Sequence, residues 1–363
     1  MPEMMPRETT LIALPTEGRD VGDWAESDTE DVHNCPVCQS TARSIKHPAL
    51  RDVTFEVAAG VWTMWECHSC RSNYLAPRPT PSSIHRAYSH YYTHRDVVSR
   101  RPITTLHGVR KFRRLLVNGY LKQIFGLDEE PASSLGWLMY ALPNARARLH
   151  HEYRNLPRLP PGGGSLLDIG SGDGAFLQRA VAIGWKVVGV EPDAKAAQMS
   201  RARGLEVITG GLEEIGAARR FDVVTLNHVI EHVHDPVGML RNCWEILKPG
   251  GTIWLDTPNS ESYGHQIFQS AWRGIEAPRH LVLFSDSALK QALQQVGFHH
   301  IRNAPRHDPT LELYRMSYVL SAGGTGIPPT LRILALALCA RLRRIIAPHR
   351  REFLTVTAQR PTC

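Results

Sequence analysis

The sequence predicts an α/β fold built on a parallel sheet, with a separate metal-binding module before it. A short apolar run, Leu166–Ile169, leads into a turn with three glycines at alternate positions, which is typical of a buried strand that passes into a helix. Two C-x2-C pairs lie in the first fifth of the chain, and such pairs are typical of metal sites. At 363 residues the chain can bury a substantial core and hold two domains with extensions.

The glycine turn identifies where a ligand binds. We expect a strand up to Ile169, a tight turn, and a helix that begins near Ala175. Glycines at 170, 172 and 174 let the backbone pass close beside a ligand, because no Cβ stands in the way. The turn delivers that ligand to the carboxyl end of the strand, where open α/β sheets bind their ligands.

Two classes of ligand fit this turn. Gly170, Gly172 and Ala175 satisfy the dinucleotide fingerprint, with Glu191 roughly 20 residues further on as a ribose-binding acid. Asp168 argues against a dinucleotide, because its carboxylate would repel a pyrophosphate. The same carboxylate suits a cofactor with an ammonium and a sulfonium, and S-adenosylmethionine (SAM) is such a cofactor.

Residues 161–304, with a final strand at 352–360, resemble the class I SAM-dependent methyltransferase family. The motifs that carry the resemblance are the glycine turn, the second strand Lys186–Glu191, the fourth strand Phe221–Asn227 with His228–His232 after it, the helix start Asp235-Pro236, and Leu247–Leu255 as helix end, turn and fifth strand. The resemblance implies a Rossmann-like sheet of seven strands. We expect Ser285 to cap a helix from Asp286 to Gln295, a sixth strand at Phe298–Asn303, and a seventh strand delayed to Phe353–Ala358.

The resemblance also implies which residues contact SAM. Asp168 and the turn would hold the methionine end through Gly170, Ser171, Gly172 and Gly174. Glu191, followed by Pro192, would hold the ribose. Gly211, Leu212 and Glu213 would lie near the adenine, while Asn227 and His228 would face the methyl group.

Two histidines are candidates for the general base. The segment Trp272–Phe284 resembles a loop that borders the acceptor pocket in metabolite methyltransferases, and it contains His280. An unperturbed histidine pKa of about 6.5 suits proton removal at neutral pH, although a purely structural histidine is the alternative. His228 is the second candidate.

A second metal is an open question. In some relatives, including ubiquinone-pathway O-methyltransferases, a Glu-x-x-Glu-His pattern binds a divalent cation. Here His228 replaces the first glutamate, while Glu231 and His232 are present. Histidine is a competent ligand for a transition metal, but these residues could instead only shape the site.

The cysteine pairs predict zinc. They read C-x2-C, 28 residues, C-x2-C, and the four thiols belong to Cys35, Cys38, Cys67 and Cys70. Four soft ligands favour a tetrahedral zinc site; a disulfide or an iron–sulfur cluster is the alternative. We expect a zinc-ribbon-like module with strands such as Val53–Val57 and Val61–Glu66. Four protein ligands leave no open position, so the predicted role is structural.

The module is followed by a tyrosine-rich run that includes Tyr88, Tyr91 and Tyr92. A zinc knuckle before such a run resembles bacterial methyltransferases that act on sugars and small metabolites, in which the module helps to form the substrate site. The tyrosines would then contact the substrate, or they would pack the module onto the catalytic domain.

We expect four regions along the chain. Residues 1–31 carry nine acids and two arginines and form a disordered acidic tail, although the whole chain has a net charge of +7. Residues 32–94 form the zinc-binding module, residues 95–160 a helical connector or lid, and residues 161–363 the methyltransferase domain with an insertion at about 306–350. The arginine-rich apolar segment 331–346 is too short to span a bilayer but could lie on one; packing against the catalytic domain is the alternative.

No signal peptide is visible, so the predicted location is cytoplasmic, with contact at the inner face of the membrane left open. The leading functional hypothesis is O-methylation of a small molecule, such as a sugar, a glycan or lipid intermediate, or a secondary metabolite. The alternatives are a C-methyltransferase acting on a nucleotide-linked keto sugar, an RNA methyltransferase, and a non-catalytic zinc-ribbon interaction protein. A nucleic-acid partner is disfavoured, because the chain has no dense basic run with interleaved aromatic residues.

Overall fold

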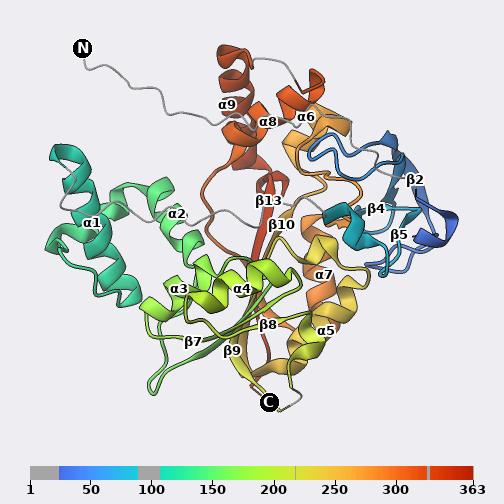
Figure 1. Cartoon of the computed structure of the whole chain (residues 1–363). Helices are drawn as coiled ribbons and strands as arrows, with labels where there is room; N and C mark the ends of the chain where they lie inside the picture. The colour runs from blue at the N-terminus through green and yellow to red at the C-terminus, as the bar shows by residue number, and fades with distance from the viewer. Residues whose placement is uncertain (1–23, 89–106, 217, 325–327, 363) are drawn as a thin grey trace.

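The computed structural model describes residues 24–88, 107–216, 218–324 and 328–362, and a seven-stranded sheet forms its centre (Figure 1). Its strand order is β12-β13-β10-β9-β6-β7-β8. The strands are β6 (Ser165–Ile169), β7 (Lys186–Glu191), β8 (Val207–Thr209), β9 (Phe221–Asn227), β10 (Leu247–Pro258), β12 (His299–Asn303) and β13 (Phe353–Gln359). Strands β10, β9, β6, β7 and β8 run parallel, and β13 runs antiparallel to both of its neighbours. The predicted seven-stranded Rossmann-like sheet is confirmed.

Helices cover both faces of this sheet. Leu166 and Leu167 belong to two different buried clusters, because successive residues of a strand point to opposite faces. One cluster packs against α3 (Ala175–Ala182) and α4 (Ala194–Ala202), and the other against α5 (Pro236–Ile246) and α7 (Asp286–Val296). The expected helix start at Ala175 and the Ser285 cap are confirmed: the Ser285 hydroxyl accepts a hydrogen bond from the backbone N–H of Ala288.

The N-terminal module is built on a four-stranded antiparallel sheet in the order β11-β4-β3-β2. Its strands are β2 (Arg43–Leu50), β3 (Trp62–Cys67), β4 (Asn73–Leu75) and β11 (Val282–Leu283). Strand β11 comes from the predicted acceptor loop, so the module and the catalytic domain share a sheet. The expected strand at Val53–Val57 is wrong: the Asp52 carboxylate accepts hydrogen bonds from three backbone N–H groups there and folds the segment into a turn.

The expected disordered tail is wrong in its last eight residues. The segment that begins at Trp24 contains η1 (Glu26–Asp28) and β1 (Thr29–Glu30), and β1 pairs with β5 (Arg78–Pro79) beside η2 (Ile84–Tyr88). The remaining residues of that prediction, 1–23, lie outside the described residues, as do Tyr91 and Tyr92.

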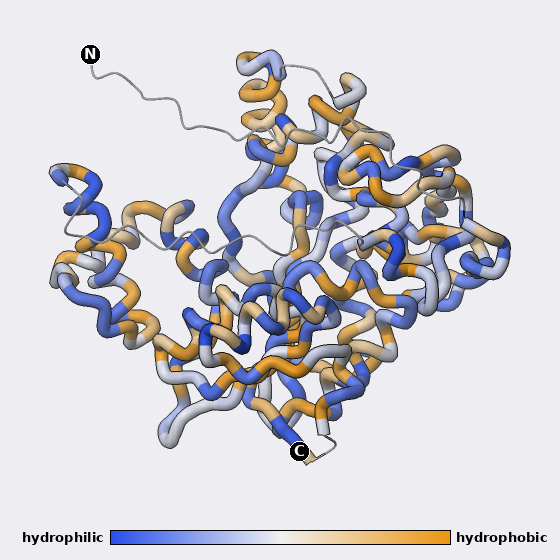
Figure 2. The backbone as a smooth tube through the Cα atoms, in the orientation of Figure 1, coloured by the Kyte–Doolittle hydropathy of each residue, from blue (hydrophilic) through white to orange (hydrophobic). Residues whose placement is uncertain are grey.

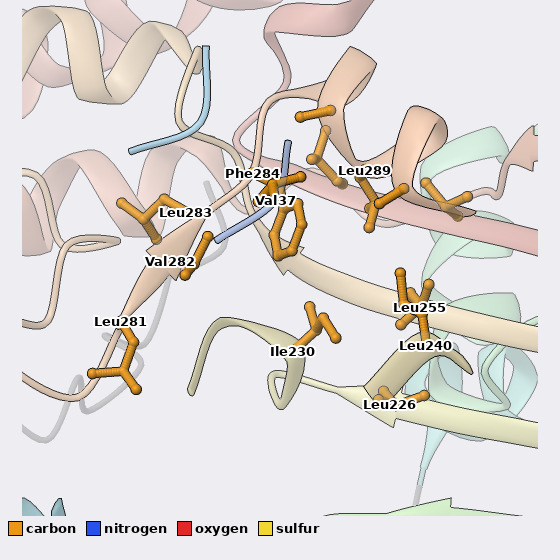
Figure 3. Packing of buried hydrophobic residues seen from close by; sticks show 14 of the residues in the cluster. Val37, Leu226, Ile230, Leu240, Leu255, Leu281, Val282, Leu283, Phe284 and Leu289 are labelled. Carbon is orange, nitrogen blue, oxygen red and sulfur yellow. The ribbon is translucent and has the colours of Figure 1, made fainter. Parts of the chain in front are cut away.

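One hydrophobic core joins the module to the catalytic domain. Val37 of the first cysteine turn lies close to Phe284 of the acceptor loop, and Ile230 and Leu255 continue the same cluster toward the sheet (Figure 3). The cluster also contains Cys35, Cys67 and Cys70. The cysteine cluster is therefore part of the core of the molecule.

The connector packs as helices on one side of the sheet (Figure 1). It consists of α1 (Gly108–Phe125), η4 (Ser134–Ala141) and α2 (Pro143–Glu152). Tyr120, Leu121 and Tyr153 form a common buried cluster with Phe176 and Leu177 of α3. The helices α6 (Tyr263–Phe268) and η7 (Gln269–Ala271) follow β10 on the other side.

The segment between β12 and β13 holds α8 (Thr310–Ser321), α9 (Thr330–Ile346) and η8 (Pro348–Arg350). Helix α9 buries Ile333, Ala337 and Ala340, while Leu331 and Ile346 are 84% and 90% exposed. Figure 2 shows apolar segments of this helix alternating with hydrophilic ones, and its last turns contain Arg341, Arg343 and Arg344. Among the described residues, no helix combines the length and the apolar character needed to cross a bilayer.

Candidate functional site

The predicted cofactor residues lie at one edge of the sheet. The loops after β6, β7, β8 and β9 leave the carboxyl ends of neighbouring parallel strands, and such ends meet at the same edge. These loops hold Gly170, Ser171, Gly172 and Gly174; Pro192; Gly211, Leu212 and Glu213; and His228. Asn227 is the last residue of β9. The fold therefore brings together the residues that the sequence singled out.

Glu191 fastens the glycine turn to the end of β7. Its carboxylate accepts hydrogen bonds from the backbone N–H of Gly172 (2.7 Å) and of Asp193 (3.0 Å). Burial raises the pKa of this carboxyl, although the two N–H groups act in the opposite direction. Gly172 has a φ of +55°, and a Cβ at that position would meet no atom within 4 Å. The turn thus presents backbone to an open space beside a buried carboxylate.

Asp168 forms a buried ion pair that the sequence did not predict. Its Oδ1 accepts hydrogen bonds from the Arg154 guanidinium and from the Thr225 hydroxyl (2.9 Å), while Oδ2 has no partner among the described residues. The guanidinium also lies 3.9 Å from the centre of the Phe176 ring. Burial raises the pKa of Asp168 despite the adjacent positive charge. The site therefore holds one anionic and one cationic group, with an acceptor oxygen left over.

Arg154 reaches this position from the connector. It lies two residues after α2 and has a φ of +46°, an uncommon conformation for a residue other than glycine. From the same helix, His151 Nε2 lies 3.5 Å from Asp256 Oδ2. The connector thus contributes side chains to the edge of the site. This position of Arg154 could not be predicted from the sequence, because no motif distinguishes it from the many other arginines of the connector.

His228 lies between two carboxylates. Its Nδ1 is 3.0 Å from Glu231 Oε1, and its Nε2 is 3.5 Å from Asp256 Oδ2. Burial lowers the pKa of His228, but the hydrogen bond and charge of Glu231 outweigh burial, so the pKa lies above its ordinary value. The side chain is 35% exposed. Of the two predicted base candidates, this is the one whose side chain is partly exposed; His280 is buried.

His280 does not have the ordinary pKa that its prediction assumed. The side chain is buried, its Nδ1 lies 2.8 Å from the carbonyl oxygen of Gly274, and burial lowers its pKa to about 4. A histidine with so low a pKa is a weak base at neutral pH. The ordinary pKa that we predicted for His280 is therefore wrong.

Glu231, His232 and His280 form a cluster that could hold a metal ion, because one ligand atom from each lies within 4.8 Å of the others. Nδ1 of His232 lies 3.0 Å from the carbonyl oxygen of Arg279 and 2.8 Å from the Tyr88 hydroxyl, and Nδ1 of His280 lies 2.8 Å from the carbonyl oxygen of Gly274. A carbonyl can only accept, so in its neutral form each ring donates its Nδ1–H to that carbonyl and keeps a lone pair on Nε2. His280 Nε2 also lies 3.9 Å from Glu276 Oε2. Two histidines and one carboxylate form a recurring transition-metal ligand set.

The four cysteines of the module also meet in one cluster. Cys35 Sγ and Cys70 Sγ are 3.6 Å apart, and Cys38 Sγ and Cys67 Sγ are 3.5 Å apart. Four thiolates around one ion at about 2.3 Å would lie about 3.8 Å from one another. The two cysteine turns match, since Gln39 and Arg71, each directly after its pair, have φ of +62° and +64°. These residues fit a tetrahedral metal site.

A second buried ion pair fixes the acceptor loop to the module. Both Arg279 Nη atoms contact the Asp52 carboxylate, at 2.9 and 2.6 Å, and both side chains are almost fully buried. The guanidinium also lies over the Phe55 ring at 4.1 Å. Asp52 thereby holds the residue next to His280. The module, through Asp52, positions the loop that carries one of the cluster's ligands.

Known proteins resemble part of this chain. Residues 142–302 match the family described as a methyltransferase domain. The ubiquinone biosynthesis O-methyltransferase of Albidiferax ferrireducens is 34% identical over 109 residues, which cover 28% of this chain and 43% of that protein. The enzyme of the same name from Thiobacillus denitrificans is 30% identical over 137 residues, or 33% of this chain and 59% of that protein.

The chain spans about half the length of these curated relatives. Among solved structures, a SAM-dependent methyltransferase from Archaeoglobus fulgidus matches with a TM-score of 0.40 and 17% identity, over 62% of this chain and 99% of that one.

Proposed function

We propose that the protein is a class I SAM-dependent methyltransferase that transfers a methyl group from SAM to a hydroxyl of a small-molecule acceptor. The match of residues 142–302 to the methyltransferase-domain family supports this proposal. The observation that carries the proposal is the carboxyl edge of the sheet, where Asp168, Arg154 and Glu191 surround the glycine turn. The curated relatives act as O-methyltransferases in ubiquinone biosynthesis by name, which favours oxygen as the accepting atom. The acceptor itself is a proposal at the level of class: a sugar, a glycan or lipid intermediate, or a secondary metabolite.

The residues at the edge fit SAM. The methionine end of SAM is a zwitterion, and the free Oδ2 of Asp168 and the guanidinium of Arg154 match its ammonium and carboxylate. The Glu191 carboxylate would hold the ribose hydroxyls. When bound, SAM supplies a methyl group activated by its sulfonium, and the protein's task is to align the acceptor and to remove a proton.

We assign removal of the proton from the acceptor hydroxyl to His228. A pKa above the ordinary histidine value makes its neutral ring a stronger base. Glu231 and Asp256 would stabilise the imidazolium once the ring has taken the proton from the acceptor hydroxyl. We expect His228→Asn to lower the methylation rate by about 100-fold or more while SAM affinity is kept. An exposed His299→Asn control should retain both, and full activity of the His228 variant would remove the residue from this role.

We also propose that Glu231, His232 and His280 bind a divalent transition-metal cation, and that the four cysteines bind structural zinc. A cation beside the acceptor would lower the pKa of a bound hydroxyl. Metal analysis of the purified protein should find two ions per chain. His280→Ala should lose one ion and the Cys67→Ser variant the other; a single ion that is insensitive to His280→Ala would contradict the second site.

The assay that tests the function uses labelled SAM with hydroxylated acceptors and, separately, a nucleotide-linked keto sugar. O-methylation should proceed without exchange of solvent deuterium at a carbon. Deuterium exchange at the α-carbon of the keto sugar, with methylation there, would favour the C-methyltransferase alternative. Methylation of RNA with a steep salt dependence would favour the RNA alternative. SAM binding without transfer to any acceptor class would favour the non-catalytic alternative.

A further inference from the structure

A cavity of about 480 Å³ lies between the α8–α9 insertion and the catalytic edge. It is lined from five parts of the chain: α2, the segment after β12, the end of α9, η8 and the start of β13. Four of its lining residues are arginines: Arg306, Arg341, Arg344 and Arg351.

The cavity has an excess of positive charge. Arg341 Nε (2.5 Å) and Arg344 Nη2 (2.8 Å) share the single carboxylate of Asp308. Arg351 donates its Nε to the carbonyl oxygen of Pro348 (3.0 Å), which is a neutral partner. Arg306 is paired with the buried carboxylate of Asp256 (3.0 Å). The other three arginines face two acidic lining residues, Asp308 and Glu352, so at least one positive charge stays uncompensated. Burial raises the pKa of Glu352 to about 7. This carboxyl is therefore only partly ionised at neutral pH and offsets less of the positive charge of the arginines.

Buried polar atoms in the lining lack partners. Arg306 Nε, His307 Nδ1 and Glu352 Oε2 have no hydrogen-bond partner among the described residues. An unpaired buried N–H is unfavourable, and such groups are rare in native proteins. Arg306 Nε is a donor in every protonation state, and an unpaired buried donor beside surplus guanidinium charge favours an anion as its missing partner.

The cavity adjoins the place where we locate methyl transfer. The Arg306 guanidinium contacts Asp256 Oδ2 (3.0 Å) and lies 3.8 Å from the centre of the Phe353 ring. Phe353 in turn meets the His228 ring edge to face, with centroids 5.2 Å apart. An anion held by the arginines would therefore be separated from His228 by one layer of side chains.

We propose that this cavity binds a phosphate or diphosphate group of the methyl acceptor. The proposal rests on the proposed function for the role of the ligand as acceptor, while the anion site itself stands on the cavity alone. Guanidinium groups match phosphate geometry and bind it through paired hydrogen bonds. The surplus of one positive charge, or of two where Glu352 is protonated, suits a phosphate, and a cavity of about 480 Å³ has room for a diphosphate. Arg154 at the glycine turn is separate and serves the cofactor.

Inorganic pyrophosphate is the probe for the first test, by calorimetric titration of the full-length protein. Arg351→Met and Arg344→Met remove charge but keep an apolar stem, and we expect each to weaken pyrophosphate binding by about tenfold or more. Arg332 is exposed on the same helix and does not line the cavity, so Arg332→Met is the matched control. SAM is titrated into the same proteins.

The outcomes separate the two claims. Weaker pyrophosphate binding in Arg351→Met with unchanged SAM binding supports the subsite. Equal pyrophosphate binding by wild type and both cavity variants, or none by folded wild type, overturns it, whatever SAM does. Failure of wild type to bind SAM while pyrophosphate still binds overturns the proposed function and leaves the anion site standing.

A phosphate can come from a soluble nucleotide or from a lipid. Competition against pyrophosphate distinguishes the two: uridine diphosphate in solution represents the first source, and vesicles of phosphatidic acid in phosphatidylcholine the second. Displacement by either supports the subsite and assigns the source. Displacement by neither, at concentrations where inorganic phosphate competes, overturns the assignment to a phosphorylated acceptor.

Discussion

Arg154 and Asp168 are the pair of residues to which we assign recognition of the cofactor. Each is buried, and each compensates the charge of the other. Removing one partner of such a pair leaves an uncompensated buried charge. A zwitterionic ligand can exchange contacts with both groups without leaving a net charge behind, so the pair is suited to the amino-acid end of SAM.

The Arg154 assignment predicts a specific loss. Wild type should bind SAM more tightly than decarboxylated SAM, because only SAM offers a carboxylate to the guanidinium. Arg154→Met should weaken SAM binding by about tenfold and should abolish the preference between the two ligands. Arg148→Met, an exposed arginine on α2, is the control for charge. Persistence of the preference in the Arg154 variant, measured by calorimetry, would refute the assignment.

Residue roles could be predicted from the sequence only where a motif carried them. Asp168 and Glu191 flank a glycine turn with a recognisable order, and the structure places both at the site edge. Arg154 escaped prediction because its position depends on a positive φ and on packing from the connector. His280 was assigned an ordinary pKa because burial cannot be read from one histidine in a loop.

The connector elements α1 and η4 meet at two glycines. A Cβ on Gly119 would lie 1.9 Å from the carbonyl oxygen of Ser133, and one on Gly136 would lie 2.3 Å from the backbone nitrogen of Tyr120. Neither neighbour is a side chain that can move aside. The close approach lets the helices bury Tyr120 against Tyr153 and α3.

Gly119→Ala should therefore separate α1 from η4. We expect a loss of about 1–3 kcal/mol in the free energy of unfolding, measured by denaturant titration. Gly216→Ala is the matched control, because a Cβ there meets nothing within 4 Å. If both variants unfold alike, the contact between α1 and η4 does not contribute to stability.

Elements with a clear apolar pattern were predictable to within a residue or two. The last two strands, expected at 298–303 and 353–358, are His299–Asn303 and Phe353–Gln359. The failure at Val53–Val57 came from a single side chain, Asp52, that competes for backbone N–H groups. Such competition by a side chain cannot be seen in the apolar pattern, because that pattern is the same whether or not the side chain bonds the backbone.

At the scale of the whole molecule, the module and the catalytic domain are joined by a shared sheet and a shared core. They share a sheet through β11 and a core through Phe284. They also share a buried histidine pair, in which His47 Nε2 lies 2.8 Å from His265 Nε2. This joining was not predictable, because the partners are far apart in the sequence and no pattern marks them.

The histidine pair predicts acid sensitivity. Burial lowers the pKa of His47 to about 4 and that of His265 to about 3. Between an unfolded value of about 6.5 and these folded values, the unfolded chain binds more protons, so stability falls as the pH falls. As the pH falls through that window, each histidine lowers the free energy of unfolding by up to about 1.4 kcal/mol per pH unit.

Thermal unfolding measured from pH 7 to pH 4 should show this loss, and a His265→Gln variant should show a shallower slope. His299→Gln, an exposed control, should follow wild type. An unchanged slope in the His265 variant would mean that the pair does not couple folding to pH.

The central claim is that the carboxyl edge of the sheet binds SAM. The most direct measurement is calorimetric titration of SAM into metal-replete wild type, Asp168→Asn and the exposed control Glu206→Gln. We predict micromolar binding by wild type and the control, and a loss of about tenfold or more in Asp168→Asn. Absence of SAM binding by folded wild type, or equal affinity in Asp168→Asn, would contradict the account.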